Sequence, residues 1–227
     1  YKTMVSVDLF FNVYPEDGAC DEGPSYWGVA GGKAFDYLNL LSAATGGKVN
    51  LFNQPLIQDI GRYIYRVYIS QGHFYTNFAD APPVINQRGG TIYRYGQQIN
   101  DEMMKGFGAF LLHKSGFGKE PLTGAVGLVL EDLFQMADWQ ETAPVEPLVP
   151  AFYFPDMQIA IARSKNGSND GFYLAAKGGS NGEGHNHNDV GSCIVFFDGK
   201  PVLIDVGVGT YTKETFTANR YKIWTMQ

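Results

Sequence analysis

The stretch GHNHNDVGSCI, residues 184–194, decides how this chain is interpreted. It brings two of the four histidines, His185 and His187, together with Asp189 at the approach to an apolar run. In an extended chain alternate side chains share a face, so we expect these three side chains to point the same way. The hairpin that follows should return Asp205 to the start of the preceding strand, beside this cluster. Two imidazoles with one or two carboxylates suit zinc binding or proton transfer.

The sequence around this stretch predicts short β-strands. They follow a proline-punctuated linker, APVEPLVP at residues 143–150. Turn sequences rich in Asn, Asp and Gly separate several of them, as hairpins require. The expected strands cover residues 151–154, 157–163, 172–176, 192–197 and 202–205. This pattern predicts the opening of an antiparallel β-sandwich, with too few strands to close two sheets.

The first 140 residues predict helices instead. Apolar residues recur at spacings of three and four, and glycines such as Gly46 and prolines such as Pro55 supply ends and starts. The expected helices lie within residues 4–13, 34–44, 56–68, 99–111 and 126–137. Long loops between them favour a helical array over a compact bundle. We therefore predict a helical domain over residues 1–142 and the start of a β-domain over residues 143–227.

Composition excludes several classes of protein. The chain has 227 residues, of which 44% are hydrophobic and 18% charged, so it can bury a sizeable core. No run of 18 apolar residues occurs, which argues against membrane insertion. A net charge of −6 without a basic run argues against nucleic acid as partner, though not against a polyanionic substrate. The first residues, YKTM, are neither a signal peptide nor a natural start, and we expect the chain to begin and end inside a longer protein.

The histidine cluster has two competing interpretations besides a metal or proton-transfer site. One is a polar surface loop, where Asn and His are common. The other is a cupin, because Gly179 stands at the expected distance before His185 and His187. A cupin needs a glutamate three or four residues after the second histidine, where this chain has Gly191 and Ser192. A helical first half does not suit a cupin either, so we set that interpretation aside.

A zinc site usually needs at least three protein ligands. His187 and Asp205 are plausible ligands, while His185 is either a ligand or a proton-transfer group. A third ligand is not evident. The other two histidines fall on or near predicted helices, where packing or surface roles are expected, and we expect the site to be incomplete in this chain.

Two further stretches contribute candidate residues. The loop DGACDEGPSYWG, residues 17–28, either caps a helix with its aromatics over the core or holds Tyr26 in a cleft as a general acid or base. The run DVGVGTY, residues 205–211, lacks the Lys-Ser/Thr ending of a phosphate loop. A tight turn that brings Tyr211 and Arg220 to the cleft is the better prediction.

These stretches together resemble the heparinase II/III-like polysaccharide lyases. The resemblance is carried by residues 17–27, by GHNHNDVGS at residues 184–192, and by DGKPVLIDVGVGTY at residues 198–211. It implies an incomplete α/α toroid followed by an antiparallel β-sandwich, with the catalytic cleft between the two. This agrees with the order of helices and strands expected from the periodicity.

The resemblance also implies an activity and its residues. The family cleaves uronic-acid polysaccharides by β-elimination: an amide or imidazole neutralises the uronate carboxylate, a tyrosine or histidine removes the C5 proton, and a tyrosine protonates the leaving oxygen. Matching positions give three catalytic candidates, which are Tyr26, His185 and, more weakly, Tyr211. Substrate contacts are expected from Glu22, Trp27, Asn188 and Arg220, the last through its fork of donors. His187 and Asp205 correspond to zinc ligands.

Two family features are missing. The residue that neutralises the carboxylate normally lies upstream of Tyr1, and the third zinc histidine normally lies just beyond Gln227. We therefore expect this chain alone to be inactive and to retain zinc weakly. A non-catalytic carbohydrate-binding relative with a structural zinc and a zinc-dependent hydrolase remain alternatives. Heparan-type glycosaminoglycan, alginate and other uronans stay open as substrates, and the family implies a secreted or periplasmic protein.

Overall fold

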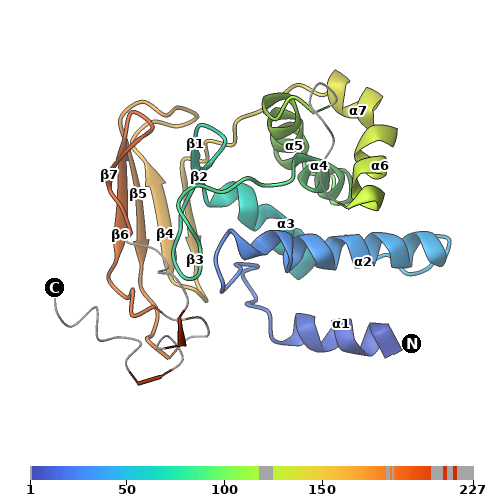
Figure 1. The fold of residues 1–227 in the computed structure, drawn as a ribbon, viewed down its shortest axis with the longest axis horizontal. Coiled ribbons are helices and arrows are strands. Elements are labelled where there is room, and N and C mark those ends of the chain that lie inside the picture. The colour runs from blue at the N-terminus through green and yellow to red at the C-terminus, as the bar shows by residue number, and fades with distance from the viewer. Residues whose placement is uncertain are drawn as a thin grey trace.

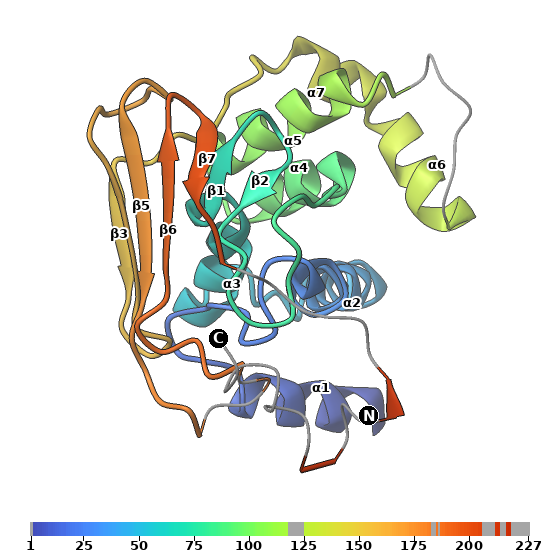
Figure 2. The same cartoon turned by 60° about the vertical axis from the view of Figure 1, so that its left-hand side comes forward.

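The computed structural model describes residues 2–117, 125–182, 185, 187–205, 212–213 and 217–218. Within these residues, helices come first, a short hairpin interrupts them, and an antiparallel sheet follows (Figure 1). The helices are α1 (Lys2–Asn12), the 3-10 helix η1 (Tyr26–Gly28), α2 (Gly31–Ala44), α3 (Pro55–Arg66), α4 (Gly89–Gln98), α5 (Glu102–Lys114), α6 (Val126–Phe134) and α7 (Met136–Glu141). The sheet stands at one side, with the helices beyond one of its faces (Figure 2).

Local sequence explains several helix ends. Pro55 opens α3, where its fixed φ suits the first turn, and α3 buries Ile57, Ile60 and Ile64 along one stripe. The side chain of Asp101 caps α5 by accepting a hydrogen bond from the Met104 N–H at 2.9 Å. Helices at these two places therefore begin where the sequence predicts a start or supplies a cap.

One predicted helix runs into a strand and another is divided in two, while the other predicted helices differ by up to three residues at their ends. The helix expected over residues 56–68 ends at Arg66, because Tyr68–Ser70 forms strand β1 and pairs with β2 (Phe74–Tyr75). Aromatic and β-branched residues at this point favour a strand, and Gly72 at a φ of 74° makes the turn. The helix expected over residues 126–137 is divided at Gln135 into α6 and α7.

Helix α4 has no counterpart among the expected helices. Its sequence GGTIYRYGQQ is buried from Gly89 to Gly96, so it shows no alternation of apolar and polar faces. Glycine is required where α4 approaches α5: a Cβ on Gly108 would lie 2.4 Å from the Tyr93 backbone nitrogen. Close packing of two backbones, rather than an apolar stripe, forms this helix pair, and periodicity cannot detect it.

The sheet contains strands β3 (Ala151–Phe154), β4 (Ile159–Arg163), β5 (Phe172–Lys177), β6 (Cys193–Phe197) and β7 (Lys200–Leu203), antiparallel and in sequence order. Alternate residues of β4, β5 and β6 are buried, whereas Tyr153, Phe172 and Leu174 are exposed on the other side. The predicted order of helices followed by antiparallel strands is therefore confirmed. One sheet of the expected sandwich lies within the described residues.

One hydrophobic core joins the helices to the sheet. The ring of Tyr63 on α3 packs edge-on against Phe154 on β3, with centroids 5.5 Å apart. Phe74 packs in the same way against Phe196 on β6, at 5.4 Å. The domain boundary placed between residues 142 and 143 stays a prediction, because the two segments share this core. No helix within the described residues is both long and apolar enough to cross a membrane.

Candidate functional site

Three loops meet where the helical part adjoins the sheet. Asp80, in the loop between β2 and α4, places Oδ2 at 2.8 Å from His185 Nδ1 and Oδ1 at 2.6 Å from His187 Nε2. Glu22, in the loop before η1, places Oε1 at 3.3 Å from His185 Nε2. The Asp80 side chain is 6% exposed and that of His185 is 43% exposed. The site thus has a buried carboxylate behind an accessible imidazole.

His185 and Asn188 are not in an extended conformation, so the regular alternation predicted from an extended chain does not hold at these residues. His185 and Asn188 adopt φ values of 51° and 56°, and the backbone turns at both residues. The two histidines still converge, because both reach the same carboxylate. Asp189 has a different partner: it is buried, and its Oδ2 accepts a hydrogen bond from the Ala79 N–H at 3.3 Å.

Tyr26 belongs to the loop that contacts this cluster. It opens η1 four residues after Glu22 and is 37% exposed. Its neighbour Ser25 donates a hydrogen bond from Oγ to the Asp80 carbonyl oxygen at 3.2 Å. A Cβ on Gly23, which has a φ of 88°, would lie 2.6 Å from the Phe78 carbonyl oxygen, so this close approach requires glycine. The loops of Tyr26 and Asp80 are therefore packed together.

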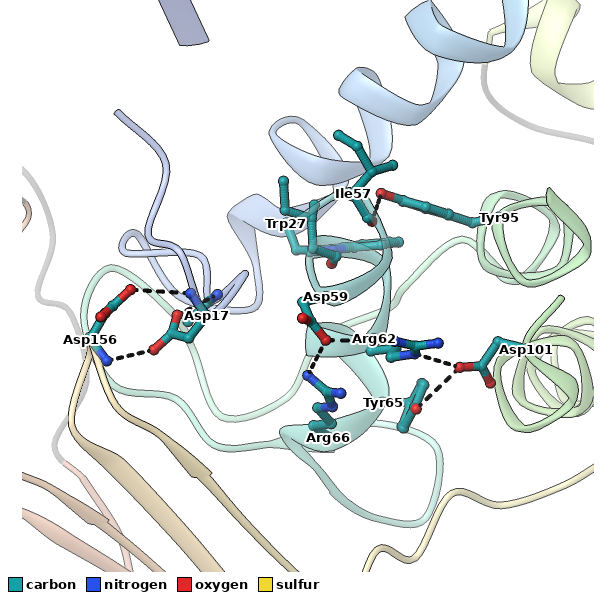
Figure 3. A network of polar contacts seen from close by, with 12 residues as sticks. Asp17, Trp27, Ile57, Asp59, Arg62, Tyr65, Arg66, Tyr95, Asp101 and Asp156 are labelled. Atoms are coloured by element: carbon teal, nitrogen blue, oxygen red, sulfur yellow. Dashed lines mark hydrogen bonds and ion pairs between the residues drawn. The ribbon is translucent and has the colours of Figure 1, made fainter. Parts of the chain in front are cut away.

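The structure places Trp27 in the core rather than at a substrate surface. Its side chain is 1% exposed, and its ring Nε1–H donates to the Ile60 carbonyl oxygen at 2.7 Å (Figure 3). The ring also stacks on Tyr95 with centroids 6.2 Å apart. Burial on all sides overturns the predicted substrate contact. Of the alternatives for this loop, an aromatic folded over the core is correct for Trp27.

The other predicted substrate contacts are distributed differently. Glu22 is one-third exposed beside His185, and Asn188 is exposed on the turn between His187 and β6. Tyr211 and Arg220 lie outside the described residues. Glu22 is therefore the predicted contact that the structure brings next to a catalytic candidate.

The predicted zinc ligands are not assembled into a metal site by the described residues. Asp205 accepts a hydrogen bond at Oδ2 from Ser192 Oγ at 2.8 Å, just before β6 begins, while His187 contacts Asp80. Imidazole and carboxylate suit zinc chemically. However, no group of three or more His, Cys, Asp or Glu side chains that could hold a metal ion occurs in the described part of the chain.

Asp80 is the residue that sequence reasoning missed. It belongs to none of the motifs, and it lies more than 100 residues from the histidines that it contacts. One signal was present: Asp80 is the only carboxylate in residues 71–88, where Arg88 and His73 are the only other ionisable side chains apart from the tyrosine. An isolated acid in such a segment is a candidate buried carboxylate with specific partners.

Two cavities lie in the helical part, away from the histidines. One, of about 260 Å³, is lined by Asn50, Phe52, Asn53, Gln58, Gln98, Ile99 and Asn100. The other, of about 190 Å³, lies between α1 and α2. Neither of these two cavities is lined by a predicted site residue. The location of the candidate site is given by the contacts of Asp80.

Comparisons with known proteins agree with the fold described above. The family model for the heparinase II/III-like C-terminal domain matches residues 146–223. A heparinase III gene product is 17% identical to the chain, with a TM-score of 0.61 over 96% of this chain and 30% of that chain. A second heparinase III structure is 13% identical, with a TM-score of 0.61 over 97% of this chain and 32% of that chain.

The chain thus spans about 30% of the length of these solved structures. A search of curated proteins gives no match. At these identities the solved structures show the fold, while the family match covers the segment that contains the histidine cluster and the sheet. Residues 146–223 thus match the heparinase II/III-like C-terminal family model, and the fold of the chain is similar to that of the heparinase III structures.

Proposed function

We propose that the full-length protein is a lyase that cleaves uronic-acid-containing polysaccharides by β-elimination. One observation carries the proposal: the loop of Glu22 and Tyr26 meets the loop of His185 at Asp80, so a phenol and an imidazole are available at one junction. The heparinase II/III-like family supports a polysaccharide lyase in general. The uronate substrate and the roles of individual residues are our proposal.

β-Elimination needs a base at C5 and an acid at the glycosidic oxygen. The His185 side chain is 43% exposed, and its Nε2, the ring nitrogen not in contact with Asp80, accepts the C5 proton. Glu22, 3.3 Å away, then accepts a hydrogen bond from the new N–H. The C4–O bond breaks, a C4=C5 double bond forms, and Tyr26 donates its phenol proton to the departing oxygen.

The remaining requirements of the reaction fall outside the described residues. We propose that neutralisation of the uronate carboxylate involves Arg220 together with an amide or imidazole from the rest of the full-length protein. Tyr211 is retained as an auxiliary proton donor. We further propose a structural zinc held through His187 and Asp205 with a third ligand outside this chain, an acidic polysaccharide as partner, and a secreted or periplasmic location.

The test uses the full-length protein on a panel of uronans, with ultraviolet absorbance of the unsaturated uronate as readout. Tyr26→Phe removes the proton donor and should lower turnover about 100-fold or more. Tyr153→Phe is the matched control, because Tyr153 is 55% exposed on the outer face of the sheet and should leave turnover unchanged. Full activity of Tyr26→Phe would refute its role.

The same panel separates the remaining alternatives. A zinc-dependent hydrolase would release saturated products and lose turnover on chelation without unfolding. A non-catalytic carbohydrate-binding relative would bind a uronan and release no product. Either result would overturn the proposal of β-elimination.

A further inference from the structure

Asp80 is held in place from two sides. The carbonyl oxygen of Asp80 accepts a hydrogen bond from Ser25 Oγ at 3.2 Å, and the preceding residue, Ala79, donates its N–H to Asp189 at 3.3 Å. The Asp80 side chain is 6% exposed. A buried carboxylate on a doubly anchored backbone has little freedom to turn, so its two oxygens keep fixed partners.

Each oxygen of Asp80 faces a different imidazole and a different ring nitrogen. Oδ2 lies 2.8 Å from His185 Nδ1, and Oδ1 lies 2.6 Å from His187 Nε2. An ionised carboxylate can only accept hydrogen bonds, so the ring nitrogen that faces it must carry the hydrogen. In a neutral imidazole the other ring nitrogen then bears the lone pair.

We propose that Asp80 is a positioning residue that holds His185 and His187 in opposite tautomers. His185 carries its hydrogen on Nδ1 and presents the Nε2 lone pair, whereas His187 carries its hydrogen on Nε2 and presents the Nδ1 lone pair. The carboxylate of Asp80 thereby gives different roles to two histidines that are two residues apart. His185 is set to accept a proton, and His187 is set to offer Nδ1 to a metal ion.

The exposures of the two rings agree with this division. The His185 side chain is 43% exposed, as a group that meets substrate requires, and the His187 side chain is 14% exposed. Glu22 also faces His185, on the Nε2 side, but its carboxylate lies 3.3 Å away, against 2.8 Å for Asp80. A neutral ring has one hydrogen, and the closer, more deeply buried carboxylate of Asp80 accepts the hydrogen bond from it. The proposed roles of the lone pairs rest on the proposed function, whereas the tautomers follow from these contacts.

The test is nuclear magnetic resonance of the metal-free full-length protein with 15N-labelled histidine, at a pH high enough that the ring nitrogen shifts no longer change with pH. Long-range proton–nitrogen correlations report which ring nitrogen carries the hydrogen. We expect Nδ1–H for His185 and Nε2–H for His187. Finding Nε2–H on both rings, the form that free histidine prefers, would overturn the proposal. This result is independent of substrate, metal and turnover, so it stands apart from failure of the proposed function.

Asp80→Asn provides the second measurement. An amide offers one acceptor and one donor group, so it cannot accept from both rings, and His185 should shift towards Nε2–H. Asp189→Asn is the matched control, because it neutralises another buried carboxylate of this region while its amide oxygen can still accept from the Ala79 N–H. Its tautomers should match those of the unaltered chain. Unchanged tautomers in folded Asp80→Asn would overturn the proposal, and if this variant fails to fold, the tautomers of the unaltered chain decide.

In the full-length protein, loss of a positioning residue should lower kcat more than it raises KM. We expect Asp80→Asn to reduce kcat 10- to 100-fold, the usual effect of removing a group that orients a functional side chain, with KM changed less than threefold. A change in KM with kcat retained would contradict the assigned role of Asp80.

Discussion

Asp17 and Asp156 cap each other's backbone across the junction between the helical part and the sheet. Asp17 Oδ2 accepts a hydrogen bond from the Asp156 N–H at 2.8 Å, and Asp156 Oδ2 accepts one from the Asp17 N–H at 3.1 Å (Figure 3). Asp17 Oδ2 also accepts a hydrogen bond from the Met157 N–H at 3.2 Å. This reciprocal pair fixes the strand turn between β3 and β4 against the loop that leads to Glu22 and Tyr26.

Asp17→Ala should lower the free energy of unfolding by about 1–3 kcal/mol, because it removes the acceptor of several backbone N–H groups at once. Denaturant unfolding measures the change. Asp8→Ala is the control, because Asp8 is exposed on α1 and should change the stability by less than about 0.5 kcal/mol. Equal stabilities of the two variants would show that the reciprocal pair does not hold the two parts together.

Gly90→Ala should destabilise the protein although alanine favours helices. A Cβ on Gly90, in the first turn of α4, would lie 1.8 Å from Asp132 Oδ1. Asp132 is itself buried and bound to Arg88 at 2.5 Å, so it cannot move aside without loss of that ion pair. The expected cost is about 2 kcal/mol, measured by thermal or denaturant unfolding.

Gly127→Ala is the matched control for this position. Gly127 lies inside α6, and nothing stands within 4 Å of the Cβ that would be added. Helix propensity alone should then apply and raise the stability by about 1 kcal/mol. A gain of stability in both variants would contradict the proposed contact of Gly90 with Asp132.

Because several tyrosines are buried, we expect the folded protein to lose stability at high pH. Burial raises the pKa of Tyr173, which contacts Thr76, from its usual 10.0 to about 12. The pKa of Tyr173 is higher in the folded than in the unfolded state. The contribution of neutral Tyr173 to the stability of the fold is therefore complete below pH 10 and is lost as the pH rises from 10.0 to about 12. Tyr65 behaves alike, since burial raises its pKa to about 12 as well.

Tyr173→Phe should therefore lose less stability between pH 10 and 12 than the unaltered chain, by on the order of 2 kcal/mol. Denaturant unfolding at a series of pH values measures this slope. Tyr153→Phe, at an exposed position, should keep the original slope. Parallel slopes for all three proteins would mean that Tyr173 is not the group that titrates.

Zinc content tests the proposed metal ligands separately from turnover. The purified full-length protein should hold zinc, measured by elemental analysis after dialysis. His187→Ala and Asp205→Ala should each lower the zinc content at least tenfold, since each removes a ligand. Tyr26→Phe should retain the zinc of the unaltered protein. Full zinc content in both ligand variants would place the metal elsewhere.

Local features of the sequence were sufficient for much of the fold. The apolar stripe of α3 with Pro55 at its start, and the hairpin of β6 and β7 around the turn at Gly199, depend on neighbours within a few residues. The end of α3 and the whole of α4 were not predictable in this way. Burial of Tyr68 and the close packing of Gly108 on Tyr93 are set by segments distant along the chain.

The order of helices and antiparallel strands could be read from residue patterns, and so could the chemical suitability of Tyr26, His185 and His187. The burial of Trp27 on Tyr95 and the contact of Asp80 with both histidines became known only from the folded chain. Separation along the chain explains this difference. Backbone propensities act over a few residues, whereas the partner of a buried charge is whichever group the folded chain brings within about 3 Å.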